Sequence, residues 1–175
     1  CIRDRFLIAI GPLVTLISGC VINKNCLLNA DANEFCGRNL VQVHLVMEAA
    51  LTLKKNLYSS RYHIACKRNN SGGYDYVQVF VEHLGAILDT YQVRGLSRQN
   101  ILAFDKRMLL GHLPFYLLKQ RLSNTGDQQE NASRLKLRYA SLWRFSIFLL
   151  PIVFMPRFIA IFWGGVSTVV GRIRY

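Results

Sequence analysis

Two long apolar stretches lie near the ends of the chain, and the region between them alternates polar and apolar positions. Phe6 to Asn23 is an 18-residue run without a charged side chain, and Phe145 to Gly171 is longer, interrupted by a single charge at Arg157. A helix needs about 20 apolar residues to cross the hydrocarbon core of a bilayer. We therefore expect a transmembrane segment within residues 1–23 and a second membrane segment within residues 134–175.

The region between these stretches, residues 24–122, carries the periodicity of amphipathic helices. Asp31-Ala-Asn-Glu34 has the spacing of a capping box, which predicts a helix that begins near residue 32. Apolar residues recur at i, i+3, i+4 and i+7 over 75–92, so a second helix is expected there. Ser97 can cap a third helix, which Pro114 should bend or break because proline lacks a backbone N–H. This pattern predicts a basic helical region outside the membrane.

A polar linker and a basic-aromatic collar precede the second apolar stretch. Residues 123–133 contain no large apolar side chain, which is typical of a linker. In the collar, residues 134–144, aromatic rings favour the membrane interface and cations favour the side on which positive charge is retained. Its side chains are candidates for binding anionic lipid or a partner: Arg134, Lys136, Arg138, Trp143 and Arg144.

Arg157 is the sixth candidate for lipid or partner binding. An arginine at the centre of a membrane span costs about 3 kcal/mol on insertion scales. Three arrangements reduce this cost: a re-entrant hairpin of two short helices, a span whose arginine faces a carboxylate or lipid phosphate, or a tilted helix from which the arginine reaches the surface. Gly164-Gly165 and Ser167-Thr168 supply small residues for close helix contact, and they favour a packed partner over a lone helix in lipid.

The chain is strongly basic. It carries 22 Lys and Arg against 10 Asp and Glu, a formal net charge of +12, and its basic residues are spread along the sequence. Such a charge attracts anionic lipid headgroups, RNA or an acidic partner. No RNA-binding or zinc-finger signature accompanies it, so nucleic acid is not the expected partner.

The cysteines suggest one candidate disulfide. The chain has five, an odd number that excludes complete pairing within the chain. Cys26 and Cys36 have nine residues between them, which resembles one arm of a twin helical-hairpin disulfide motif. No cysteine-histidine cluster has zinc spacing, so no metal site is expected.

Two short resemblances bear on location. The run that ends at Leu16-Ile17-Ser18-Gly19-Cys20 resembles a bacterial lipoprotein signal, in which the cysteine becomes the acylated N-terminus. Leu113 to Leu122 is similar to a leucine-arginine motif of LETM-type mitochondrial inner-membrane proteins. The first resemblance implies an envelope lipoprotein and the second a mitochondrial location.

No motif in the chain indicates catalysis. The four histidines are distributed over different expected elements, and no HExxH, GxGxxG, GxxxxGK[ST] or GxSxG pattern occurs. We therefore assign no catalytic residue, cofactor or metal. A membrane-bound lipid-modifying enzyme remains an alternative, with His83 and His112 as its first candidates.

These patterns together predict a mainly α integral membrane protein with hydrophobic helices near both termini and an amphipathic helical middle region. Its expected segments are 1–23, 24–122, 123–133 and 134–175. We expect a non-catalytic accessory or scaffold subunit of a larger membrane complex, such as a mitochondrial energy-converting complex. It would bind other subunits and an anionic phospholipid such as cardiolipin. The expected location is a membrane, either the mitochondrial inner membrane or, for a lipoprotein of an envelope or secretion assembly, the bacterial envelope.

Overall fold

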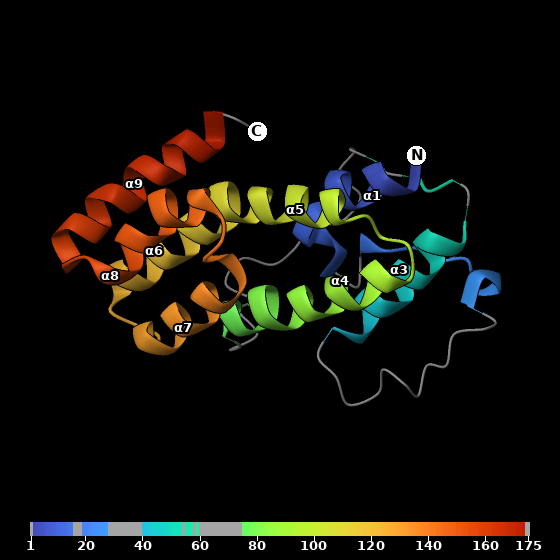
Figure 1. Ribbon diagram of the computed structural model, residues 1–175, viewed down its shortest axis with the longest axis horizontal. Helices are drawn as coiled ribbons and strands as arrows, with labels where there is room; N and C mark the ends of the chain where they lie inside the picture. Colours follow the sequence, from blue (N-terminus) through green and yellow to red (C-terminus); the bar gives the residue numbers. More distant parts are fainter. Residues whose placement is uncertain are drawn as a thin grey trace. The chain divides into compact units, whose positions relative to one another are not determined.

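The computed structural model describes residues 2–15, 19–27, 40–53, 55–57, 59 and 75–173. These residues are mainly helical and include no β-strand. They form two compact units, each with buried apolar side chains. Figure 1 shows the helices as a ribbon. Unit 1 takes its residues from 1–74 and 83–104, and unit 2 from 75–82 and 105–175.

Unit 1 is organised around the pairing of its two longest helices, α3 and α4. The Tyr91 hydroxyl donates to the backbone carbonyl of His44 at 3.0 Å and lies 3.0 Å from a carboxylate oxygen of Glu48. Arg94 forms an ion pair with the same carboxylate. The elements of unit 1 are α1 (Ile2–Ile10), η1 (Gly11–Thr15), η3 (Lys24–Leu27), α3 (Val41–Thr52), α4 (Leu84–Val93) and the first part of α5 (Arg98–Arg107).

Two helix starts expected from the sequence are confirmed. Asp75 accepts hydrogen bonds from two backbone N–H groups of the following turn, and the chain is helical from there through α4. The Ser97 hydroxyl accepts from the N–H of Asn100 at 3.3 Å, and α5 begins at the next residue, Arg98. The capping-box residues 31–34 lie outside the described residues.

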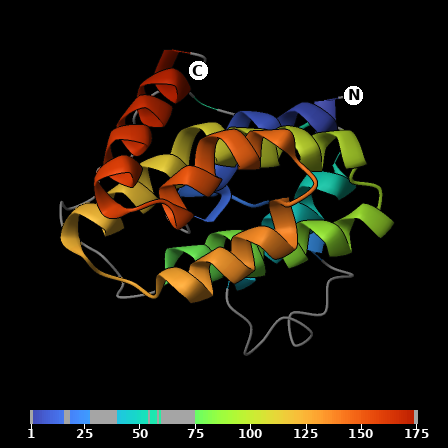
Figure 2. The same cartoon turned by 60° about the vertical axis from the view of Figure 1, so that its left-hand side comes forward.

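Unit 2 contains the second apolar stretch, folded as two helical segments. Figures 1 and 2 show α9 alongside α6 and α8. The elements of unit 2 are the start of the π-helical η4 (Gln78–His83), the π turn η5 (Met108–His112), α6 (Leu113–Ser123), α7 (Gln128–Tyr139), the π turn η6 (Phe145–Leu149), α8 (Leu150–Phe154) and α9 (Arg157–Ile173).

Two prolines follow directly on π turns instead of breaking their helices. Pro114 comes after η5 and Pro151 after η6, each within the first two residues of the next α-helix. A proline in a helix lacks an N–H and crowds the carbonyl four residues earlier, and a π turn widens the backbone there. The helix therefore continues through Pro114 without a break, and a π turn over Met108–His112 precedes this proline.

The turn between α6 and α7 is shorter than the expected linker, 123–133. Asn124 has a φ of 53° and Gly126 a φ of 82°, so the chain reverses in a few residues. The Asp127 side chain accepts from the N–H groups of Gln129 and Glu130. This cap starts α7 at residue 128, because the carboxylate satisfies two N–H groups that a helix N-terminus leaves open.

The prediction of an integral membrane protein is wrong. Among the residues that the structure describes, no helix combines the length and the apolar character needed to span a membrane. Gly11, with a φ of 53°, ends α1, and Pro156 separates α8 from α9. The transmembrane helices, the mitochondrial inner-membrane location and the alternative location in a bacterial envelope are therefore withdrawn. Apolar content alone suggested two spans, whereas glycine and proline divide both stretches into shorter helices.

Candidate interaction face on helix α9

Helix α9 separates its side chains by size onto two opposite faces. Its buried side, the inner face, carries small residues: Ala160, Gly164, Ser167 and Gly171. Its exposed side, the outer face, carries large apolar residues: Phe158, Ile159, Phe162, Val166 and Val169. A surface helix normally directs its large apolar residues toward the core. In α9 this arrangement is reversed.

The small inner residues allow α9 to approach α6 and η5 closely. A Cβ atom on Gly164 would lie 3.1 Å from Cδ1 of Leu118, and one on Gly171 would overlap the carbonyl oxygen of Leu110. Leu110 stands four residues before Pro114, which has no N–H to donate to this carbonyl. The backbone of α9 thus packs where a larger side chain would be excluded.

A second proline contributes to the orientation of α9. Pro151 cannot donate to the carbonyl of Ile147, four residues earlier, and the indole N–H of Trp163 donates to that oxygen at 2.7 Å. The hydroxyl of Ser167 donates to the neighbouring carbonyl of Phe148 at 3.3 Å. These two bonds fix the rotation of α9 about its axis, so the outer face remains directed away from α6 and α8.

Arg121 binds the corner at which α8 ends. Its Nε donates to the carbonyl of Ile152 at 2.8 Å, and its Nη2 donates to the carbonyls of Val153 and, at 3.2 Å, Met155. Pro156 has no N–H for the Ile152 carbonyl, and the residue before it is held in an extended conformation. The guanidinium supplies donors that the helix itself lacks, which stabilises the turn into α9.

The aromatic side chains of the outer face are largely exposed. Phe158 is 73% and Phe162 69% exposed, and Val169, farther along the same side, is 57% exposed. Residues 158–171 include no charged residue, and Phe154, just before α9, is also exposed. Contiguous exposed apolar side chains are uncommon on folded proteins and mark interaction surfaces.

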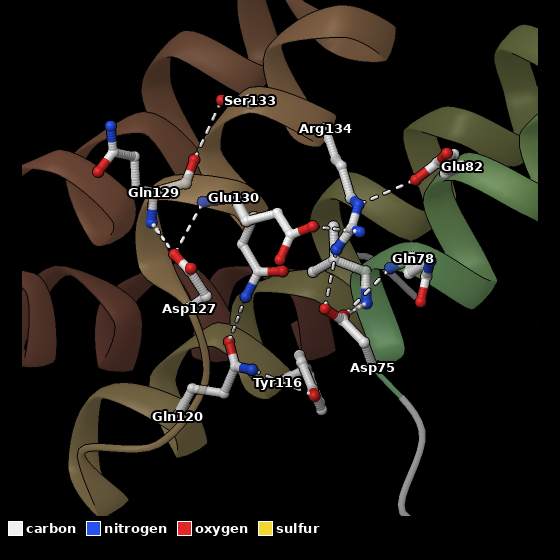
Figure 3. A network of polar contacts seen from close by, with 12 residues as sticks. Asp75, Gln78, Glu82, Tyr116, Gln120, Asp127, Gln129, Glu130, Ser133 and Arg134 are labelled. Atoms are coloured by element: carbon white, nitrogen blue, oxygen red, sulfur yellow. Dashed lines mark hydrogen bonds and ion pairs between the residues drawn. The ribbon is translucent and has the colours of Figure 1, made fainter.

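Arg134, one of the six predicted binding residues, is held by ion pairs within unit 2. Figure 3 shows its guanidinium among three carboxylates, those of Asp75, Glu82 and Glu130. The distances are 2.9, 2.9 and 2.6 Å, and the Arg134 side chain is only 16% exposed. Arg134 therefore joins α7 to the helix that begins after Asp75.

Arg138 is also bound within unit 2. Its Nε lies 3.2 Å from a carboxylate oxygen of Asp105, which is buried. The adjacent Tyr139 is fully buried, and this burial raises the pKa of its hydroxyl above the ordinary value. The Asp105 carboxylate adds to the rise in pKa, whereas Arg138 opposes it. Arg138 thus belongs to the core of unit 2.

Lys136, Trp143 and Arg144 form cation-aromatic pairs at the surface. The Nζ of Lys136 lies 4.4 Å from the ring centroid of Phe154, and the guanidinium carbon of Arg144 lies 4.5 Å from that of Trp143. Both rings are about half exposed. Cations over aromatic faces contribute about 0.5–1 kcal/mol at exposed sites. Lys136 thereby places a positive charge beside the apolar surface that leads into α9.

Arg157, the first residue of α9, donates from Nη2 to the carbonyl of Leu122 at 3.0 Å. Leu122 lies in the last turn of α6, where a helix leaves carbonyl groups open. The Arg157 residue is exposed. It therefore ties α9 to α6 and also supplies positive charge at the beginning of the outer face.

The surroundings of α9 are rich in positive charge. Residues 131–175 contain seven Lys and Arg and no Asp or Glu. The acidic residues of unit 2 all accept hydrogen bonds or ion pairs within that unit: Asp75, Glu82, Asp105, Asp127 and Glu130. Lys136, against Phe154, and Arg157, at the start of α9, place positive charge near the outer face.

The remaining candidates are the predicted disulfide and a metal site. Cys26 is half-buried in η3 and Cys36 lies outside the described residues, so the disulfide stays a prediction. Within the described ranges, no group of three His, Cys, Asp or Glu could hold a metal ion.

Hydropathy alone does not reveal the outer face. It predicts a membrane segment over residues 145–171, and a membrane gives all sides of a helix the same surroundings. The signal was nevertheless present, because Ala160, Gly164, Ser167 and Gly171 follow one another at steps of four, three and four. Of the small residues expected at a helix contact, Gly164 lies against Leu118 and Ser167 donates to the carbonyl of Phe148, both in the same unit, whereas a Cβ on Gly165 would meet no atom within 4 Å.

Comparison with known proteins adds no family assignment. No protein-family model, curated protein or solved structure matches the chain. The surface of α9 and its charged surroundings are thus the basis for a functional assignment.

Proposed function

We propose that this chain is a protein-binding subunit of a multiprotein assembly and that the outer face of α9 is its binding surface. The observation that carries the proposal is the reversed arrangement of α9, with small residues buried and phenylalanines exposed. Fully burying a phenylalanine side chain contributes about 1.5–3 kcal/mol. In the isolated chain this contribution is largely missing for Phe158 and Phe162, and a partner would supply it.

The size and type of the exposed residues support a protein partner. Interfaces are enriched in aromatic residues at their centres, and a few such residues provide most of the binding free energy. The outer face offers two phenylalanines with aliphatic neighbours on one rigid helix. An accessory role without catalysis is the corresponding expectation.

Substituting Phe162 tests this proposal. Because the side chain is 69% exposed, Phe162→Glu should leave folding unchanged while placing a charge in the centre of the interface. The measurement is the size of the 175-residue chain on native electrophoresis of cell extracts, with folding checked by circular dichroism. The variant is expected to migrate as the isolated 20.0 kDa chain, and the unmodified protein as a larger species.

Leu137→Glu is the matched control. Leu137 lies on α7, is 89% exposed and receives the same charge. It should migrate with the unmodified protein. If both variants keep the larger size, or if the unmodified protein is itself only a 20.0 kDa species, the outer face does not bind a partner.

A further inference from the structure

Resting on the proposed function, we infer that the partner is a protein with an apolar groove that receives α9 and with carboxylates along the rim of that groove. Two independent observations lead to this description. One is the shape of the outer face, and the other is the sign of the charge around it.

The outer face has the form of a helix that inserts into a groove. Phe158, Phe162 and Val169 lie within about 40° of one another around the helix axis, and they extend along about 17 Å of it. Ile159 and Val166 flank them and are less exposed, at 38% and 39%. Phe158 and Phe162 stand on successive turns, and Val169 stands two turns farther along, after Gly165. Helices with apolar anchors along one face bind in hydrophobic grooves. The partner surface is therefore concave.

The charge around this ridge is positive. Lys136 lies against Phe154, Arg157 opens α9, and residues 131–175 contain no acid. A carboxylate from the partner would meet these cations without competition from an acid of the same segment. Complementary charge at the rim of an interface increases the association rate and suppresses wrong partners.

A second copy of this chain fits the surface poorly. Two outer faces packed on each other would bring together the same basic residues, and like charges across an interface are unfavourable. An anionic lipid surface would satisfy the charge. However, a helix that binds anionic lipid typically carries Lys and Arg along its polar face, whereas residues 158–171 of α9 contain none. Charge and shape together favour an acidic-rimmed protein groove.

Site-specific cross-linking identifies the partner. A benzophenone-bearing phenylalanine is placed at position 162 of the full chain, and the cross-linked peptide is identified by mass spectrometry from native cells. We expect one partner protein, cross-linked at an apolar groove with Asp or Glu at its rim. A cross-link to a second copy, or to a surface without acidic residues, would overturn the inference.

Titration with the purified partner tests the charge. Lys136→Glu should weaken binding about tenfold at 50 mM salt and less at 300 mM, because salt screens exposed charges. Lys136→Arg keeps the charge and should bind within about twofold of the unmodified chain. Equal affinity of the Lys136→Glu variant at both salt concentrations contradicts the acidic rim.

The outcomes separate the two proposals. One outcome is binding of the partner that depends on Phe162 but is unaffected by Lys136→Glu and by salt. This result would contradict the inferred acidic rim and would be consistent with the proposed function. The chain could instead bind vesicles of phosphatidylglycerol and phosphatidylcholine, lose this binding in Phe162→Glu, and give no protein cross-link. This result would overturn both the proposed function and the inference about the partner. A Phe162→Glu variant that keeps its native assembly size overturns the proposed function directly.

Discussion

At the scale of single residues, the carbonyl oxygen of Leu110 explains the glycine at position 171. A Cβ at that position would overlap this oxygen, which belongs to the backbone and cannot rotate away. Gly165, on the same helix, has no atom within 4 Å of where its Cβ would be. Gly165 and Gly171, on the same helix, therefore have different roles.

We expect Gly171→Ala to lower the free energy of unfolding by about 2 kcal/mol, because overpacking forces the backbone to shift. Gly165→Ala is the matched substitution and should raise it by about 0.5–1 kcal/mol, since alanine favours the helix. Urea denaturation followed by circular dichroism measures both. Equal effects of the two substitutions would show that α9 does not pack closely on η5.

Tyr139 gives unit 2 a dependence on alkaline pH. Burial raises the pKa of its hydroxyl, whereas in the unfolded chain the hydroxyl titrates near pH 10. The unfolded state loses the proton first, so the free energy of unfolding should fall as pH rises above about 10, by about 1.4 kcal/mol per pH unit from this group. Tyr139→Phe should lack this part of the decrease. Urea unfolding of both proteins between pH 8 and 11 measures the difference, and identical slopes would contradict the burial of Tyr139.

At the scale of elements, prolines explain how the second apolar stretch folds. Each of Pro114, Pro151 and Pro156 leaves the carbonyl four residues earlier without its helical N–H donor. Two of these carbonyls accept from side chains, that of Ile147 from Trp163 and that of Ile152 from Arg121, and the carbonyl of Leu110 lies against Gly171. All three prolines therefore contribute to positioning α9, and of the three only Pro156 divides the stretch.

Arg121→Met tests the corner between α8 and α9. Removing donors from three carbonyls should lower the free energy of unfolding by about 2–3 kcal/mol, because hydrogen bonds to charged groups contribute more than neutral ones. Lys119→Met, an exposed position on the same helix, should change it by about 0.5 kcal/mol or less. Guanidinium denaturation compares the two. A loss no greater in Arg121→Met than in Lys119→Met would mean that the carbonyls are satisfied in another way.

At the scale of the whole molecule, the basic residues are spread along the sequence, and the contacts of each one decide its role. The net charge of +12 is spread along the sequence, while in unit 2 every acid is engaged by groups of the same unit. Arg134 and Arg138 stabilise the fold through these acids, so their charge is partly compensated. Lys136, Arg144 and Arg157 lie instead beside aromatic rings or helix ends at the surface. The predicted basic candidates thus divide into two that are paired with acids of the fold and three that contact aromatic rings or a helix end.

The sequence by itself determined the helical character of the chain and several helix starts. The 75–92 periodicity and the Ser97 cap are local signals, and local hydrogen bonds and apolar spacing suffice to place them. The sequence also showed the apolar stretch 145–171 and its interruption at Pro156-Arg157. What surrounds such a stretch depends on contacts between residues far apart in the chain.

Only the tertiary structure decided how those residues are used. It directed the small side of α9 toward α6, left the phenylalanines exposed, and paired Arg134 and Arg138 with carboxylates distant in sequence. Hydropathy counts apolar atoms without regard to which face of a helix they occupy, so it could not distinguish a membrane span from a helix with one packed and one exposed side. That distinction requires the position of the neighbouring helix.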